Sequence, residues 1–275
     1  MALHEDETRK HAFGLDAAAY DAHRPRYPRA LIDRIAEHAG LGPESRALEI
    51  GCGTGIATLP FAELGCSIRG IELSEAMAAV ARAKLARFPR VVIETARFED
   101  WRGDGDFDLV FCAQAWHWLP PHARYQKTRA LLRASGTLAV FANWDTAFID
   151  QVQPIYRRYG FVESHADECE KREEWGELYS PDVDRSIEDV RAAITMSRAY
   201  SDIEFHRFPW ARTFNASEYL ALLRTMSFHS TLPPDVREPF LADIGAAITA
   251  AGGTVTQRYE AVLLLARPAP EASAR

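Results

Sequence analysis

The first half of the chain alternates short apolar segments with longer segments whose apolar residues recur at helical spacing. Some of the short segments, such as 108–113 and 136–142, are apolar almost throughout, which is typical of parallel strands covered by helices on both faces. Strands that alternate with helices in this way indicate a doubly wound, Rossmann-like α/β core. The predicted strands of this half are 46–50, 67–73, 90–95, 108–113 and 136–142.

Residues with special backbone or capping properties mark the helices between these strands. Pro28 suits the first turn of a helix that Gly40 can end in the left-handed conformation. Ser74 can cap an alanine-rich helix over 75–88, because its hydroxyl can accept a hydrogen bond from a free backbone N–H. A further helix follows the first strand and runs through Leu64.

The pattern changes after Trp144. Residues 147–200 are predicted to be mostly helical, and their acidic stretch at 163–177 is interpreted as a solvated helix face. The rest of the chain combines strand and helix patterns and lacks internal repeats. It predicts strands at 203–214 and 254–268 and helices at 216–228 and 234–253.

Composition and charge narrow the classes of protein to which the chain can belong. It has 275 residues, of which 47% are hydrophobic and 26% charged, enough for one large folded domain. Its net charge of −7 opposes electrostatic binding of nucleic acid. We expect no secretory signal and no membrane span, since no run approaches the ~18–20 apolar residues that a span requires.

The cysteines bear on location and on metal binding. Cys52, Cys66, Cys112 and Cys169 are scattered and form no close pair at the spacing of metal ligands. This usage favours a reduced, cytoplasmic protein and indicates no metal site.

A glycine-rich turn at 47–58 is the most specific feature of the sequence. In ALEIGCGTGIAT a predicted strand leads into a turn with Gly51, Gly53 and Gly55, and a helix leaves the turn. Glycines at these positions allow a tight turn and a close approach of backbone to ligand, while the helix N-terminus offers free N–H groups.

Two residues in and beside this turn argue against a phosphate-bearing dinucleotide. The dinucleotide-binding turn G-x-G-x-x-G would place its third glycine at position 56, where the chain has Ile56. Glu49 lies two residues before the first glycine, and its negative charge would repel a pyrophosphate but could pair with a cationic amine. NAD and FAD are therefore disfavoured.

Glu72 ends the second predicted strand about 20 residues beyond the turn, where nucleotide-binding α/β folds hold a ribose diol. The alternative is an acid that only caps the helix beginning near Ser74. The segment ARFEDW (96–101) follows the third strand and offers an apolar wall and an acceptor for a base. The wall could be Phe98 or Trp101, and the acceptor Glu99 or Asp100.

In this order and at these spacings, the residues resemble a class I S-adenosylmethionine-dependent methyltransferase of the small-molecule type. The resemblance covers the chain from about Tyr20 to Phe141. It implies a seven-stranded sheet whose final strand is antiparallel to the rest, with the cofactor across the carboxyl ends of strands one to four. It rests on EIGCGTG (49–55), IELSEAM (71–77), ARFEDW (96–101), FDLVFCAQAWHWL (107–119) and LLRASGTLAVF (131–141).

The resemblance also implies roles for individual residues. Those expected beside the methionyl part of S-adenosylmethionine are Glu49, Gly51, Gly53 and Gln114. Those expected beside its adenosine are Glu72 for the ribose hydroxyls, Leu73 and Met77 for packing, and Phe98 and Glu99 for adenine.

The segment AAAYDAHRPRYP (17–28) is similar to a Y-x-x-x-R-P-x-Y-P segment found in a subset of these enzymes. It implies that Tyr20 and Arg24 fold over the cofactor, with Arg24 a candidate for its carboxylate; the alternative for Arg24 is an ordinary surface ion pair. One departure is Ala134–Ser135, where many relatives have Pro-Gly in a loop distant from the cofactor.

We expect five segments in the chain. They are N-terminal cap helices at 1–40, a cofactor-binding α/β core at 41–146, a helical cap insertion at 147–200, closing strands with lid helices at 201–268, and a tail at 269–275.

The expected activity is methyl transfer from S-adenosylmethionine to a small molecule, with an oxygen or carbon acceptor favoured. His117 follows the fourth strand and is the candidate base, although it could instead only shape the pocket wall between its two tryptophan neighbours. Trp116 and Trp144 are candidate walls for the acceptor. Rival interpretations are a cofactor-binding protein without methyl transfer and, less favoured, an NAD-dependent oxidoreductase. The sequence does not indicate the oligomeric state.

Overall fold

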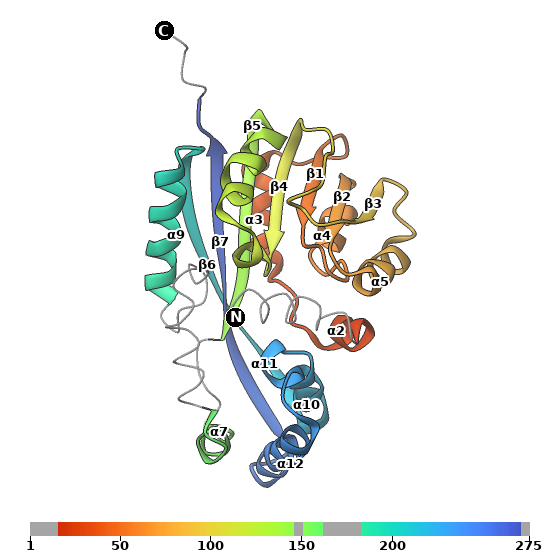
Figure 1. The fold of residues 1–275 in the computed structure, drawn as a ribbon, viewed down its shortest axis with the longest axis vertical. Coiled ribbons are helices and arrows are strands. Elements are labelled where there is room, and N and C mark those ends of the chain that lie inside the picture. Colours follow the sequence, from red (N-terminus) through yellow and green to blue (C-terminus); the bar gives the residue numbers. More distant parts are fainter. Residues whose placement is uncertain (1–15, 146–150, 162–182, 271–275) are drawn as a thin grey trace.

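The computed structural model describes residues 16–145, 151–161 and 183–270 (Figure 1). Its centre is a seven-stranded sheet in the order β3-β2-β1-β4-β5-β7-β6. β7 is antiparallel to both its neighbours, whereas the other pairs are parallel, which confirms the predicted fold class. The strands are β1 (Arg46–Ile50), β2 (Ser67–Glu72), β3 (Val91–Thr95), β4 (Phe107–Ala113), β5 (Leu132–Asp145), β6 (Tyr200–Asn215) and β7 (Thr254–Pro268).

Helices cover both faces of this sheet, as the continuously apolar strands predict. One face packs against α3 (Arg29–Ala39), α4 (Thr58–Glu63) and α5 (Glu75–Leu85). The other packs against α9 (Val183–Ser197) and the short elements between β4 and β5. Those short elements are η1 (Trp116–Trp118), η2 (Ala123–Lys127) and α6 (Thr128–Leu131).

The predicted helix signals act as expected. Gly40 ends α3 in the left-handed conformation, with a φ of 61°. The Ser74 hydroxyl caps α5 by accepting a hydrogen bond from the Met77 backbone N–H. These caps determine where α3 ends and where α5 begins, and therefore where the loops that join them to the neighbouring strands lie.

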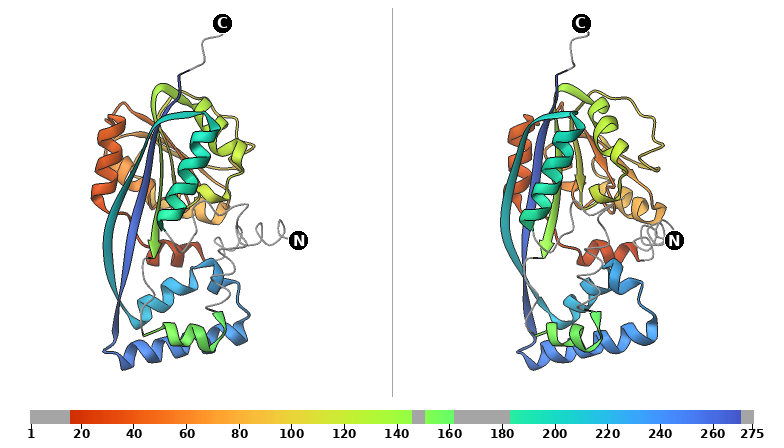
Figure 2. Two further views of the ribbon diagram at one scale, coloured as in Figure 1. Left: turned by 90° about the vertical axis from the view of Figure 1, so that its left-hand side faces the viewer. Right: turned by 60° about the vertical axis from the view of Figure 1, so that its left-hand side comes forward.

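β5 and β6 are longer than predicted, and β6 and β7 extend together past the rest of the sheet. This two-stranded ribbon leads to a group of helices beyond the carboxyl ends of β1–β5 (Figures 1 and 2). The group has its own apolar core, which includes residues of β6 and β7. Its helices are α7 (Gln153–Arg158), α10 (Ala216–Arg224), α11 (Ser227–Ser230) and α12 (Pro234–Ala250). Helix α2 (Ala17–His23) lies between this group and the α/β core (Figure 2).

The predicted segment boundaries remain predictions. Of the predicted cap insertion at 147–200, the structure describes α7, α9 and the residues around them. The acidic stretch at 163–177, the first part of the N-terminal segment and the end of the tail lie outside the described residues.

Candidate active site

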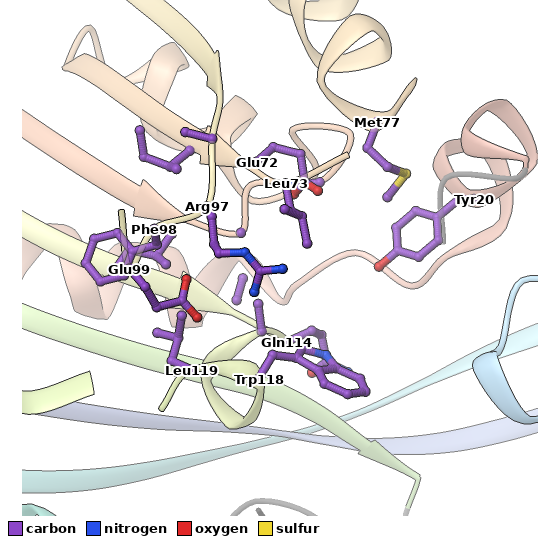
Figure 3. Close-up of a pocket in the computed structure, with 17 residues that line it drawn as sticks. Tyr20, Glu72, Leu73, Met77, Arg97, Phe98, Glu99, Gln114, Trp118 and Leu119 are labelled. Atoms are coloured by element: carbon purple, nitrogen blue, oxygen red, sulfur yellow. Dashed lines mark hydrogen bonds between the residues drawn. The ribbon is translucent and has the colours of Figure 1, made fainter. Parts of the chain in front are cut away.

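A cavity of about 870 Å³, partly open to solvent, lies at the carboxyl ends of β1, β2, β3 and β4. This is the edge where ligands bind in open α/β sheets. Figure 3 shows Phe98 and Glu99 toward one end of the cavity and Tyr20 toward the other. Its lining includes the predicted cofactor residues Tyr20, Gly51, Gly53, Glu72, Leu73, Met77, Phe98, Glu99 and Gln114.

The glycine-rich turn brings backbone to the wall of this cavity. The Gly51 N–H donates a 2.8 Å hydrogen bond to the Ile71 carbonyl, which ties the turn to the neighbouring strand. Gly51 has a φ of 67°, and a Cβ there would lie 2.6 Å from the Ala115 Cβ. Gly53 has a φ of 55°, with more room around it. Both positions therefore need glycine for their backbone conformation, and Gly51 needs it for space as well.

Glu72 is held in place by the backbone on both sides of it. Its Oε2 accepts a 2.8 Å hydrogen bond from the Gly53 N–H, and its Oε1 accepts one of 2.8 Å from the Ser74 N–H. Burial raises the pKa of this carboxyl, while these backbone donors oppose the increase. Glu72 thus binds the start of α5 and also lines the cavity, where its remaining lone pairs can accept hydrogen bonds from a diol.

Glu49 lies behind the cavity wall and is not among its lining residues. Its side chain is buried, and its Oε2 accepts a 2.5 Å hydrogen bond from the Thr58 hydroxyl. Burial, with a smaller contribution from the charge of Glu72, raises the pKa of Glu49 to about 8. At neutral pH the group is thus largely a neutral acid, because ionising it would leave a charge in an apolar surrounding.

The conformation of the loop after β3 determines which of the predicted adenine contacts line the cavity. Phe98 and Glu99 line the cavity, whereas Trp101 turns away and donates a 2.9 Å hydrogen bond from its Nε1 to Glu94. The Lys127 ammonium donates to the Phe98 carbonyl and, at 3.0 and 2.8 Å, to the carbonyls of Glu99 and Trp101. Together with Arg102, which also donates to the carbonyls of Glu99 and Trp101, Lys127 holds the loop in the shape that presents Phe98 and Glu99.

Helix α2 is fastened over the cavity by Asp21. The carboxylate accepts a 2.7 Å hydrogen bond from the Thr54 hydroxyl in the glycine-rich turn and forms an ion pair with Lys84 on α5. Tyr20, the preceding residue, reaches the cavity. Arg24 is not among the lining residues; its guanidinium lies 4.7 Å from the Tyr20 ring centre and donates a 2.7 Å hydrogen bond to the Thr225 carbonyl.

At the end of β4, Gln114 connects the cavity to β5. It has a φ of 60°, and its Oε1 accepts a 2.7 Å hydrogen bond from the Asn143 N–H. The side chain is therefore oriented before any ligand arrives.

The three aromatic residues predicted near the acceptor, His117, Trp116 and Trp144, lie in different places, and none of them lines the cavity, whereas their neighbour Trp118 does. His117 is buried, with its ring centre 4.6 Å from that of Trp118, and is not among the lining residues. Trp116 is in the core beneath, edge-on to Tyr125. Trp144 packs with Ala142 and Val262 on the face of the sheet that α9 covers.

Arg97 was not among the predicted site residues. Figure 3 shows its guanidinium projecting into the cavity toward Gln114 and Trp118. It adds a positive charge to a lining whose other charged residues, Glu72 and Glu99, are acidic. The apolar contact Leu119 was also missed. Among the described residues, no three histidine, cysteine or acidic side chains group closely enough to hold a metal ion.

Comparison with known proteins agrees with this geometry. Residues 47–136 match the family model described as a methyltransferase domain. The chain is 28% identical over 227 residues to an uncharacterized methyltransferase of Mycobacterium tuberculosis, covering 82% of this chain and 81% of the relative.

Among solved structures, a proposed type II methyltransferase from Anaeromyxobacter dehalogenans aligns with a TM-score of 0.59 at 22% identity, covering 90% of this chain and 97% of that one. An S-adenosylmethionine-dependent methyltransferase from Geobacter sulfurreducens, solved with S-adenosylhomocysteine, aligns with a TM-score of 0.52 at 14% identity, covering 91% and 96%. At identities this low, the comparison shows only that these solved structures share the fold of this chain.

Proposed function

We propose that this chain, which belongs to the class I S-adenosylmethionine-dependent methyltransferases, transfers the methyl group to an oxygen or carbon atom of a small-molecule acceptor. The observation that carries the proposal is the Glu72 carboxylate, which is anchored by two backbone N–H groups and lines the cavity at the carboxyl ends of the strands. Such a carboxylate can receive a ribose diol without first being ordered.

The lining residues fit S-adenosylmethionine along its length. Phe98 offers an apolar face for adenine and Glu99 an acceptor for its exocyclic amine, while Glu72 is at the ribose. Gly51 and Gln114 lie at the ends of β1 and β4, where the methionyl part is expected. When bound, S-adenosylmethionine supplies a methyl group on a sulfonium that is already electrophilic. The protein needs mainly to align the acceptor and to exclude water.

Two predicted cofactor residues act on this site from outside the lining. Glu49 lies behind the glycine-rich turn and does not line the cavity. Its neutral carboxyl can ionise when a cationic amine approaches. Arg24 braces the Tyr20 ring from the cap side. We propose that both residues support the methionyl end indirectly.

The acceptor side contains a rigid aromatic wall. Trp118 faces the cavity and His117 packs behind it. The role for His117 that agrees best with this packing is to hold the Trp118 ring, and its role as a base remains a prediction. Trp116 and Trp144 remain predicted acceptor contacts, although neither lines the cavity.

Charge and composition support our proposals for the location of the protein and the class of its acceptor. No helix within the described residues has the length and hydropathy to cross a bilayer. Cys52, Cys66 and Cys112 are free thiols, which suits the cytoplasmic location we propose. The net charge of −7 favours a small-molecule acceptor over a nucleic acid.

Side-by-side calorimetric titration with S-adenosylmethionine, S-adenosylhomocysteine and NAD tests the cofactor. We expect the first two to bind and NAD not to bind. A screen for transfer of labelled methyl to hydroxylated and carbon-acid small molecules then tests turnover. Binding without transfer to any acceptor would favour the rival interpretation, a cofactor-binding protein that does not catalyse transfer.

A further inference from the structure

Asp145 is a carboxylate that the cofactor site leaves unexplained. It is the last residue of β5 and pairs across the sheet with Tyr259 of β7. Its side chain is accessible to solvent, and no group within the described residues donates a hydrogen bond to it. Yet protein surrounds the carboxylate so closely that burial raises its pKa to about 6, against the opposing charge of Arg24. Asp145 is thus an exposed residue whose carboxylate a ligand can reach.

Asp145 does not line the cavity, but two connections relate it to residues that do. Gln114, which lines the cavity, accepts a hydrogen bond from the Asn143 N–H. Asp145 is two residues beyond Asn143 on β5. The side chains of Asn143 and Asp145 therefore lie on the same face of the sheet, roughly 6.6 Å apart along the strand. Tyr20, also a lining residue, stacks with Arg24, whose charge acts on Asp145.

The charged and titratable groups around Asp145 come from four other elements. Arg24 follows α2, Tyr156 is on α7, Tyr219 is on α10 and Tyr259 is on β7. Burial holds the pKa of each tyrosine above its usual value, and the Asp145 charge adds to that effect. The tyrosines are therefore protonated at neutral pH. Among these groups the aspartate is thus the one able to take a proton.

Two stacked aromatic rings lie on the strands beside Asp145, with Trp210 half-buried and Tyr259 buried. The Trp210 ring stacks on Tyr259 with centres 4.6 Å apart and planes inclined by 21°. The Trp210 Nε1 donates a 3.0 Å hydrogen bond to Asn143, which fixes the pair against β5. A planar acceptor can lie against the exposed part of Trp210 with a polar group toward the carboxylate.

We propose, on the basis of the proposed function, that Asp145 accepts the proton of a phenolic hydroxyl that is to be methylated. The acceptor O–H bond breaks and its proton goes to an Asp145 oxygen. The phenolic oxygen gains a bond to the methyl carbon, and the former sulfur–carbon bonding pair stays on sulfur. The enzyme then returns the proton from Asp145 to water.

The test uses catechol as the hydroxylated probe, 1,2-dimethoxybenzene as its proton-free counterpart and benzylamine as a cationic one. The proteins are the wild type, Asp145→Asn, which keeps the shape but is not basic, and Asp145→Ala. The matched control is Asp184→Asn, an exposed aspartate on α9. Affinity for S-adenosylhomocysteine, measured by calorimetry, should change less than twofold in every variant.

In the wild type loaded with S-adenosylhomocysteine, we expect catechol to bind at least tenfold more tightly than 1,2-dimethoxybenzene. Asp145→Ala should remove that preference. With S-adenosylmethionine, Asp145→Asn should slow catechol methylation by 100-fold or more, as loss of a general base does. The wild-type rate should fall below about pH 6, and this acid limb should be absent from the residual activity of Asp145→Asn.

Equal catechol methylation by the wild type and Asp145→Asn would overturn the role of Asp145 and leave the proposed function standing. Wild-type protein that binds S-adenosylhomocysteine but not catechol would refute the phenolic acceptor. A wild-type preference for benzylamine that is lost in Asp145→Ala would assign the carboxylate to charge pairing, again contradicting the proposal. Failure to bind S-adenosylhomocysteine would instead contradict the proposed function itself.

Discussion

The role of Glu72 gives a prediction whose size follows from the structure. Each of its oxygens accepts one backbone hydrogen bond and has a second lone pair left for the ribose. A hydrogen bond to a charged group contributes about 1.5–3 kcal/mol, so two ribose hydroxyls at the lower value contribute about 3 kcal/mol. At 1.4 kcal/mol per tenfold, Glu72→Ala should weaken S-adenosylhomocysteine binding roughly 100-fold.

Calorimetric titration measures this loss, and denaturant unfolding must accompany it. Glu72→Ala also leaves the Gly53 and Ser74 N–H groups without their acceptor, which can cost about 1–3 kcal/mol of stability. Glu75→Gln is the matched control, because Glu75 is exposed and pairs with Arg82 on the outer side of α5. We expect its cofactor affinity to match the wild type.

A ligand lacking the hydroxyls separates direct contact from loop disorder. S-adenosylhomocysteine without its ribose hydroxyls should bind the wild type roughly 100-fold more weakly than the parent compound. Against Glu72→Ala the two ligands should bind almost equally, since the partner of the hydroxyls is gone. If removing the hydroxyls weakens binding equally in both proteins, Glu72 does not hold the ribose.

Three further predictions concern the surroundings of the site. Gly51→Ala should unfold at lower denaturant concentration than Gly53→Ala, because both have positive φ but only the first brings a Cβ within 2.6 Å of a neighbouring side chain. Glu49→Gln should stabilise the ligand-free protein increasingly as pH rises from 4.5 to about 8, by at most about 5 kcal/mol, because the unfolded carboxyl ionises in that range while the folded one stays protonated. Unfolding curves for both proteins between pH 5 and pH 8.5 measure this; a pH-independent difference would contradict the raised pKa. Asp21→Ala should raise the Kd of S-adenosylhomocysteine about fivefold to tenfold in calorimetry, because α2 loses one hydrogen bond and one ion pair over the cavity. An unchanged Kd would show that α2 is held by its other contacts.

Much of the fold could be predicted because burial leaves a local signature in the sequence. Strands such as β4 are apolar at nearly every position, with Asp108 the one exception in β4, since both of their faces are covered. The extension of β5 through Asn143 and Asp145 carries no such signature, because those polar side chains lie at the edge where the sheet leaves the core. Its pairing with β7 comes from more than 110 residues away and is invisible to local pattern.

The same limit explains which predicted site residues the structure brings to the cavity and which it does not. The contacts of Gly53 and Glu72 follow from strand ends and a turn, so sequence spacing was enough to bring them together. Trp144 was expected at the acceptor because the strand was predicted to end before it. β5 continues to Asp145, and its side chains alternate between the two faces of the sheet up to that residue. The Trp144 side chain therefore lies on the face that α9 covers.

Trp116 and Trp118 show a second limit. Both are in one short 3-10 turn, and the turn alone decides that Trp118 faces the cavity while Trp116 enters the core. No spacing rule distinguishes such neighbours. Arg97 was missed for a similar reason, since its direction depends on the loop shape that Lys127 holds.

The order of the elements along the chain separates the residues that line the cavity from the helices of the cap, although both lie at the same edge of the sheet. Every residue that lines the cavity lies between Tyr20 and Leu119, whereas α10, α11 and α12 are inserted between β6 and β7. Insertions, deletions and substitutions in that later part can reshape the cap without changing a single residue of the cavity lining. A lineage of such proteins could therefore exchange one methyl acceptor for another by altering the last third of the gene, while the donor site is inherited intact.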